Sequence, residues 1–220
     1  MRIGIITYDH PHRKTQDLIC RLKLTGYYNI ELIVLPWVER NCHKPFYPHR
    51  PTEAVNITIG QLSRRMGLTH RYGELTEILS DNEYDKILIA GSGILPPGVL
   101  KYNIINSHPG YLPNVRGLDA LKWAILWDHP IGVTTYFIGE QVDTGIMIDR
   151  RILPLNFTDT FHSIAQRLYE LEITMLAESI EAEPDGKQLT EKLGYPVTGR
   201  MGHADEIRMI ARLNKMLSVL

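Results

Sequence analysis

The alternation of short apolar segments with an amphipathic segment at the start of the chain constrains its fold more than any other feature. Arg2–Tyr8 is an apolar, β-branched run that is typical of a buried strand. Asp9-His10-Pro11 interrupts this run, and apolar residues at helical spacing follow until Gly26. Ile30–Pro36 is a second apolar run. A strand, a helix and a strand within this length predict a parallel α/β sheet.

Apolar periodicity along the rest of the chain predicts further elements. The predicted helices span Ile57–Met66, Glu74–Leu79, Leu118–Leu126, Thr158–Glu181 and Ala204–Leu217. The predicted strands span Lys86–Ala90, Ile104–Asn106, Gly132–Ile138 and Gly145–Ile152, and the proline-rich residues 39–55 are predicted to form a surface loop. The expected fold is therefore α/β and Rossmann-like. It has a mostly parallel twisted sheet, helices on both faces, and an antiparallel portion around the turn at 140–144.

The chain has 220 residues, a length that suits one domain. We expect residues 1–155 to form the catalytic core. Residues 156–220 are expected to form a helical C-terminal extension that packs on the same domain.

Composition excludes several classes of protein. The apolar runs are much shorter than a bilayer span, so no membrane partner is expected. The two cysteines are too few for a disulfide framework and favour the reducing cytoplasm, with Cys20 in the core on the apolar side of its helix. The formal net charge of −1 disfavours a nucleic-acid partner. The nine histidines are too loosely spaced to indicate a metal site.

Polar residues at the end of one buried strand are the strongest functional signal. Asn106 and His108 are two residues apart on an extended segment, so their side chains should lie on the same side. Ligands of open α/β sheets bind beyond the carboxyl ends of such strands. Asp143 lies in a later turn, and if the sheet brings that turn over His108, the three groups suit acyl transfer. Taken separately, a His-Pro strand end and an Asp-Thr-Gly sequence are more often ordinary turns.

Four segments in a fixed order strengthen the functional interpretation. They are Asn106–Gly117 (NSHPGYLPNVRG), Trp123–Ile125 (WAI), Gly132–Thr134 (GVT) and Val142–Gly145 (VDTG). This order resembles the core of the folate-dependent formyltransferases, whose pattern is Asn-x-His-Pro-x-x-Leu-Pro-x-x-Arg-Gly followed by an Asp-x-Gly turn. The family includes glycinamide ribonucleotide formyltransferase, methionyl-tRNA formyltransferase and the sugar N-formyltransferases.

The resemblance implies a formyltransferase fold and the transfer of a formyl group from 10-formyltetrahydrofolate to an amine. Asn106 and a protonated His108 would stabilise the oxyanion, and Asp143 would keep His108 cationic and order a water that relays the proton. The folate would contact one loop after the strand at 86–90 and a second loop at the end of the strand at 132–138. The implied folate-binding residues are Gly91, Ser92, Gly93, Ile94, Leu95, Ile138, Gly139, Glu140 and Val142.

Departures from the family pattern narrow the choice of acceptor substrate. The glycinamide ribonucleotide enzyme has a Gly-rich phosphate loop after its first strand, whereas this chain has the basic segment Tyr8–Lys14. The methionyl-tRNA enzyme adds a second domain that helps to hold tRNA, whereas the residues after Arg150 are predicted to be helical here. We therefore favour a small amine acceptor, a nucleotide-linked amino sugar, although Tyr136 stands where many of the sugar enzymes have a histidine.

Two alternatives stay open. A 10-formyltetrahydrofolate hydrolase would release formate without an acceptor, and a non-catalytic module for a folate or nucleotide would bind without turnover. The proton-transfer set of Asn106, His108 and Asp143 argues against the binding module, which has no need of it. The terminal helices either form a homodimer interface or pack on the sheet.

Overall fold

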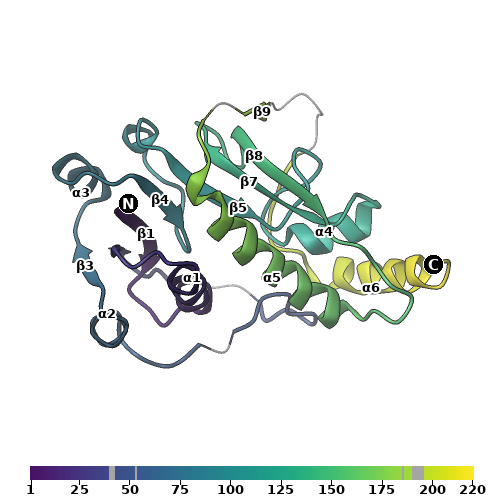
Figure 1. The fold of residues 1–220 in the computed structure, drawn as a ribbon. Helices are drawn as coiled ribbons and strands as arrows, with labels where there is room; N and C mark the ends of the chain where they lie inside the picture. Colours follow the sequence, from purple (N-terminus) through teal and green to yellow (C-terminus); the bar gives the residue numbers. More distant parts are fainter. Residues whose placement is uncertain (40–42, 53, 185, 190–195) are drawn as a thin grey trace.

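A computed structural model of the chain describes residues 1–39, 43–52, 54–184, 186–189 and 196–220 (Figure 1). Within these residues, eight strands form one sheet in the order β3-β2-β1-β4-β5-β7-β8-β9. The strands are β1 (Ile3–Tyr8), β2 (Ile30–Leu35), β3 (Thr69–Tyr72), β4 (Lys86–Ile89), β5 (Ile104–His108), β7 (Gly132–Ile138), β8 (Gly145–Ile152) and β9 (Gln188–Leu189). A second, small sheet pairs β6 (Arg116–Gly117) with β10 (Val197–Thr198).

The main sheet divides into a parallel and an antiparallel part. Strands β3, β2, β1, β4 and β5 pair in parallel. Strand β7 runs antiparallel to β5, and β8 and β9 continue the antiparallel pairing. This arrangement confirms the predicted α/β sheet with an antiparallel portion. The change of direction between β5 and β7 places the polar end of β5 at the junction of the two parts.

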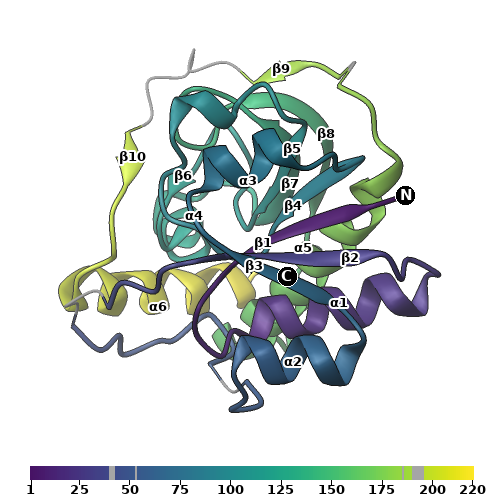
Figure 2. The same ribbon diagram turned by 90° about the vertical axis from the view of Figure 1, so that its left-hand side faces the viewer.

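Helices cover both faces of the sheet (Figure 2). The helices are α1 (Arg13–Leu24), α2 (Ile59–Met66), α3 (Leu75–Asp81), α4 (Ala120–Trp127), α5 (Phe161–Glu178) and α6 (His203–Leu217), with short 3₁₀ turns η1 (Pro97–Val99) and η2 (Ser179–Glu181). Helices α1 and α2 lie on one side of β1 to β3, and α3 lies on the other. Helix α5 packs on α1, β5 and β7, and α6 packs on α4.

The alternation of side chains along the strands separates the cores on the two faces. Ile3 and Ile5 of β1 join the cluster under α1 and α2, whereas Ile6 joins the cluster under α3. The pattern is that of a parallel sheet buried on both faces, where the strands are apolar throughout. A third cluster joins α4, α5 and α6.

Several sequence predictions differ from the structure. The strands β3, β6, β9 and β10 were not predicted, and residues 156–220 contain two of them as well as their helices. All four residues of β3 are exposed, so no apolar pattern marks this edge strand. The prediction that Cys20 lies in the core was wrong, because its position on α1 is exposed. Cys42 lies outside the described residues.

No helix in the described part of the chain is long and apolar enough to cross a membrane.

Candidate active site

The carboxyl end of β5 carries two of the predicted site residues. Pairing with β7 places Asn106 opposite Tyr136 and His108 opposite Thr134. The residue between them, Ser107, is buried and contacts the hydroxyl of Thr135, 2.9 Å away. Asn106 and His108 therefore share one face of the strand, as the alternation of an extended chain requires. The His108 side chain is buried in that face.

The turn between β7 and β8 brings Asp143 to the same place. The register of β5 and β7 pairs Ile105 with Phe137, so β7 ends beside the start of β5, far from His108. The turn must therefore fold back across the sheet, because one Asp143 oxygen lies 3.6 Å from Nδ1 of His108. Asp143 adopts a left-handed backbone conformation with φ of 53°, which aspartate tolerates better than most residues.

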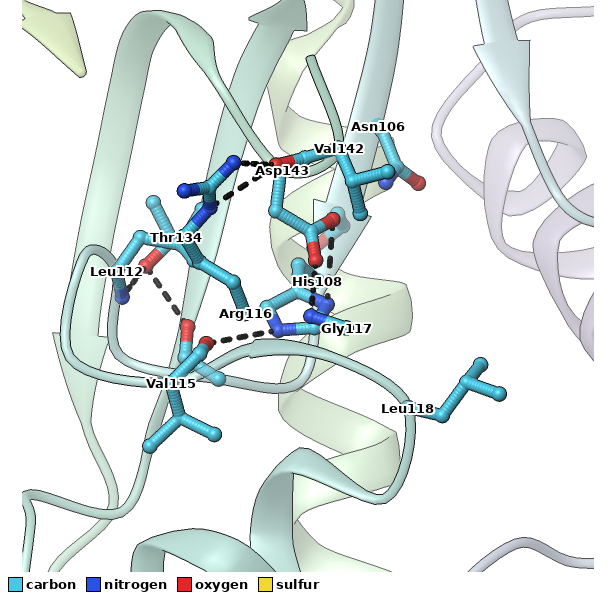
Figure 3. Close-up of polar contacts among 12 residues, drawn as sticks. Asn106, His108, Leu112, Val115, Arg116, Gly117, Leu118, Thr134, Val142 and Asp143 are labelled. Atoms are coloured by element: carbon cyan, nitrogen blue, oxygen red, sulfur yellow. Dashed lines mark hydrogen bonds and ion pairs between the residues drawn. The ribbon is translucent and has the colours of Figure 1, made fainter. Parts of the chain in front are cut away.

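Two hydrogen-bond donors and the His108 ring surround the Asp143 carboxylate, and Figure 3 shows Gly117 and His108 beside it. The backbone N–H of Gly117 donates to Oδ2 at 2.6 Å, and the hydroxyl of Tyr136 donates to Oδ1 at 2.8 Å. The His108 ring faces Oδ1 at ion-pair distance. Gly117 is required here because its φ is 94° and an added Cβ would collide with the Thr198 carbonyl. The small β6–β10 sheet thus positions a donor for the site.

Both nitrogens of the His108 ring face oxygen acceptors. Nε2 lies 3.1 Å from the Val115 carbonyl, and Nδ1 faces Asp143 at 3.6 Å. Only a doubly protonated ring can donate from both nitrogens. The Nδ1 distance is longer than a hydrogen bond, so a substrate atom can take part in bonding at this edge. Gly110 lets the ring lie close to the loop, since a Cβ there would come within 2.5 Å of Nε2.

A second group of contacts holds the loops that carry these residues. The Arg116 guanidinium donates to the Val142 carbonyl from Nε at 3.0 Å and from a terminal nitrogen at 2.6 Å. The Thr134 hydroxyl accepts from the Leu112 N–H at 3.0 Å and donates to the Gly110 carbonyl at 2.9 Å. These bonds tie the turn that carries Asp143 and the loop after β5 to the sheet.

Tyr136 is a site residue whose contacts the sequence did not predict. Its hydroxyl accepts from Nδ2 of Asn106 at 3.0 Å and donates to Asp143. Burial, followed by the nearby negative charge of Asp143, raises the pKa of the Tyr136 phenol well above its ordinary value. The signal that could have found it is the register, since Tyr136 directly faces Asn106.

The structure places the predicted folate-binding residues on two loops. Gly91, Ser92, Gly93, Ile94 and Leu95 follow β4, and Ile138, Gly139, Glu140 and Val142 form the end of β7 and its turn. Leu95 and Ile138 pack against one apolar cluster, which links the loops, whereas Ile94 is 90% exposed. A cavity of about 240 Å³ is lined by Ile138 and Gly139 among others, but by none of Asn106, His108 and Asp143.

A second buried polar cluster lies behind the candidate site. Glu172 of α5 is fully buried and bonds to Lys14 Nζ at 2.7 Å and to the Arg50 guanidinium. Lys14 Nζ also donates to the Ser107 carbonyl at 3.4 Å, which links this cluster to the strand that carries Asn106 and His108. Burial, followed by the charge of Lys14, lowers the pKa of the neighbouring His12 to about 4.

In the described ranges, no group of three or more His, Cys, Asp or Glu residues is placed to hold a metal ion.

The sequence model of the family described as Formyl transferase matches residues 61–180, more than half of the chain. The chain therefore belongs to the formyl transferase family, which confirms the resemblance found in its motifs.

Sequence and structure comparisons give relatives within this family. A methionyl-tRNA formyltransferase of Caldanaerobacter subterraneus is 28% identical over 156 residues, which are 66% of this chain and 50% of that protein. The chain spans about half or less of the length of the curated relatives it matches.

Two solved structures share the fold. A phosphoribosylglycinamide formyltransferase of Anaplasma phagocytophilum superposes with a TM-score of 0.60 and 20% identity, over 82% of this chain and 84% of that one. A sugar N-formyltransferase of a Shewanella species superposes with a TM-score of 0.62 and 16% identity, over 96% of this chain and 87% of that one.

Proposed function

We propose that the protein transfers a formyl group from 10-formyltetrahydrofolate to the amine of a small acceptor, with Asn106, His108 and Asp143 as catalytic residues. The observation that carries this proposal is the cluster at the end of β5. It holds an amide, an imidazole and a carboxylate within one connected set of contacts. Membership of the formyl transferase family supports the same chemistry.

Each residue has a defined task in this proposal. The donor supplies an activated formyl group, whose carbon forms a bond to the acceptor nitrogen while its bond to N10 of the folate breaks. Asn106 and the imidazolium of His108 donate to the formyl oxygen as negative charge develops on it. Asp143 faces the His108 ring and stabilises its positive charge, and it takes part in moving a proton from the attacking amine toward the leaving N10 nitrogen.

The donor site is assigned to the loops already described. The main-chain groups and apolar side chains of Gly91, Ser92, Gly93, Ile94, Leu95, Ile138, Gly139, Glu140 and Val142 would contact the folate. Apolar walls with a few polar anchors are typical of cofactor sites. Residues 1–155 would form the catalytic core and residues 156–220 the extension, and the contacts of α5 with α1, β5 and β7 support packing on a single domain.

For the acceptor we favour a nucleotide-linked amino sugar. The Shewanella sugar N-formyltransferase superposes over 96% of the chain, whereas the phosphoribosylglycinamide formyltransferase superposes over 82%. The residues after β1 also favour a different acceptor from that of the purine enzyme. They include His10, His12 and Lys14 in place of a Gly-rich loop.

Thermal unfolding with 5-formyltetrahydrofolate tests the donor site. A ligand at about 100 times its dissociation constant should stabilise the protein by about 2.7 kcal/mol. The measurement compares the unfolding midpoint with and without this folate. An unchanged midpoint at saturating folate contradicts the donor assignment.

Turnover then separates the three candidate functions. The protein is incubated with 10-formyltetrahydrofolate and a panel of amines, nucleotide-linked amino sugars first. Formylated amine supports the transferase, whereas formate released without any amine supports the hydrolase. Folate binding without either product supports a binding module.

A further inference from the structure

The hydroxyl of Tyr136 connects two proposed catalytic residues, Asn106 and Asp143, through one hydrogen bond to each. It accepts from Nδ2 of Asn106 at 3.0 Å and donates to Oδ1 of Asp143 at 2.8 Å. The Tyr136 side chain is 2% exposed, so water does not compete freely for these bonds.

The protons available to Asn106, Tyr136 and Asp143 allow only one set of hydrogen-bond directions. A phenol hydroxyl carries a single proton, and an ionised carboxylate only accepts hydrogen bonds. The Tyr136 proton must therefore go to Asp143, and the hydroxyl oxygen can only accept from Asn106. Because the pKa of the phenol is raised well above its ordinary value, Tyr136 keeps this proton at neutral pH. Asn106 must then turn its NH₂ end, not its carbonyl end, toward Tyr136.

We propose that Tyr136 is a positioning residue that fixes the side-chain amide of Asn106 with its NH₂ end in the site. This inference rests on the proposed function, in which Asn106 donates to the formyl oxygen. The NH₂ group has two N–H bonds. One donates to the Tyr136 hydroxyl, and the other is free to donate to the substrate. A rotated amide would present its carbonyl oxygen and repel the charge that develops on the formyl oxygen.

The orientation is relayed from Asp143. Its second oxygen accepts from the Gly117 N–H at 2.6 Å, which fixes the carboxylate. Oδ1 of Asp143 then accepts the Tyr136 proton and so fixes the direction of the hydroxyl. That direction determines which end of the Asn106 amide faces Tyr136. In this proposal Tyr136 does not touch the formyl group. It acts through the two residues to which it is hydrogen-bonded, Asn106 and Asp143, and the orientation of the amide is its action through Asn106.

An infrared measurement with a stable donor analogue tests this orientation directly. The probe is 10-formylfolate with ¹³C in its formyl group, bound to the wild type, Asn106→Ala, Tyr136→Phe and Tyr169→Phe. A hydrogen bond from Asn106 should lower the formyl C=O stretching frequency of the bound probe. We expect Asn106→Ala to remove most of this lowering and Tyr136→Phe to remove at least half of it.

Tyr169→Phe is the matched control. The Tyr169 hydroxyl donates to Oδ2 of Asp17 at 2.8 Å, so this variant also loses a phenol–carboxylate bond of the same length, but on α5. The C=O frequency in this variant should equal that of the wild type. The unfolding midpoints of the two Phe variants show whether they are equally well folded.

Turnover of 10-formyltetrahydrofolate, with the acceptor identified by the amine panel or with water, gives a second readout. Tyr136→Phe should lower kcat by roughly 10- to 100-fold, less than the roughly 100- to 1,000-fold expected when an oxyanion donor is deleted. The KM for the donor should stay within about twofold. In an Asn106→Ala background the same change should have a clearly smaller effect, because the action of Tyr136 through Asn106 is already lost and only its bond to Asp143 remains to be removed.

The outcomes separate this inference from the proposed function. If the probe does not bind the wild type, the proposed function fails and the inference fails with it. If Asn106→Ala leaves the frequency unchanged, the role given to Asn106 is wrong. If Asn106→Ala removes most of the lowering while Tyr136→Phe matches the wild type, only the positioning role of Tyr136 is overturned.

Discussion

Two buried polar clusters lie on opposite sides of β5, and they are built differently. On one side, Asp143 faces Nδ1 of His108 at 3.6 Å and accepts hydrogen bonds from the Gly117 N–H and the Tyr136 hydroxyl. On the other side, fully buried Glu172 bonds to Lys14 at 2.7 Å and also to Arg50. Ser107 lies between the clusters, since its carbonyl accepts from Lys14.

The difference in contact length corresponds to a difference in role. In the Glu172 cluster a buried carboxylate is matched by close cations, as a buried charge requires. In the Asp143 cluster the imidazole and carboxylate are near enough to interact but too far apart for a direct hydrogen bond, which leaves bonding capacity for a substrate. The Glu172 cluster should therefore serve stability and the Asp143 cluster catalysis. Substitutions in the two clusters should have correspondingly different effects.

The largest expected effect is on catalysis, from Asp143→Asn. The change keeps the size of the side chain but removes the charge that stabilises the imidazolium of His108. We expect kcat to fall by roughly 100- to 10,000-fold, the usual contribution of acid–base catalysis. The unfolding free energy should fall by no more than about 1–3 kcal/mol, because the new NH₂ group faces one of the two donors that the carboxylate accepted from. Formyl transfer and chemical denaturation are measured on the same preparation.

Asp149→Asn is the control for this variant. Asp149 lies on β8, is partly exposed and pairs with Arg151 at 2.7 Å, so the same substitution occurs on the same hairpin outside the site. It should keep the wild-type rate. A near-normal rate in Asp143→Asn would show that the carboxylate has no catalytic task.

The next effect is on stability, from Glu172→Ala. Removing Glu172 leaves buried Lys14 and the Arg50 guanidinium without their carboxylate, and breaking a buried pair in this way costs about 3–5 kcal/mol. We expect a loss of this size in urea denaturation. The rate per folded molecule should change by less than about tenfold, because the Asp143 cluster stays intact.

Glu170→Ala provides the comparison on the same helix. Glu170 is exposed and accepts from Gln166 one turn earlier, so its loss should change the unfolding free energy by about 0.5 kcal/mol or less. Equal stability losses for the two variants would contradict a structural role for the Glu172 cluster.

These two clusters also show what the sequence could predict. Strands such as β1, β7 and β8 are apolar enough for periodicity to identify them. Asn106 and His108 could be placed together because they share one strand. The exposed strand β3 carries no such pattern, and its pairing with β2 depends on tertiary context.

The Glu172 cluster could not be predicted because its members are far apart along the chain. Lys14 and Glu172 are separated by 158 residues, and each lies on a helix whose pattern allows a charged residue. The sequence predicted the contact of Asp143 with His108 only on the condition that the sheet brings the turn over His108. In the structure the turn folds back across the sheet to make this contact. Family resemblance, not periodicity, connected these residues before the structure did.

The smallest expected effect is the pH dependence of stability caused by two buried histidines, His12 beside the Glu172 cluster and His49 beside Asp119. Burial, followed by Lys14, lowers the pKa of His12 to about 4, and burial, followed by Arg50, lowers the pKa of His49 to about 3. Both histidines titrate near 6.5 in the unfolded chain. Below pH 6.5 the unfolded chain therefore binds protons that the folded protein does not, and the folded state loses stability as the pH falls.

The loss should be on the order of 1 kcal/mol for each histidine at pH 5.5, from the linkage between protonation and folding. Urea denaturation from pH 7.5 to pH 5 measures it, and His12→Gln and His49→Gln should each make the dependence shallower. His162→Gln, on an exposed position of α5, should leave the dependence as it is in the wild type. If all three variants have the same slope, His12 and His49 are not the source of the acid sensitivity between pH 7.5 and pH 5.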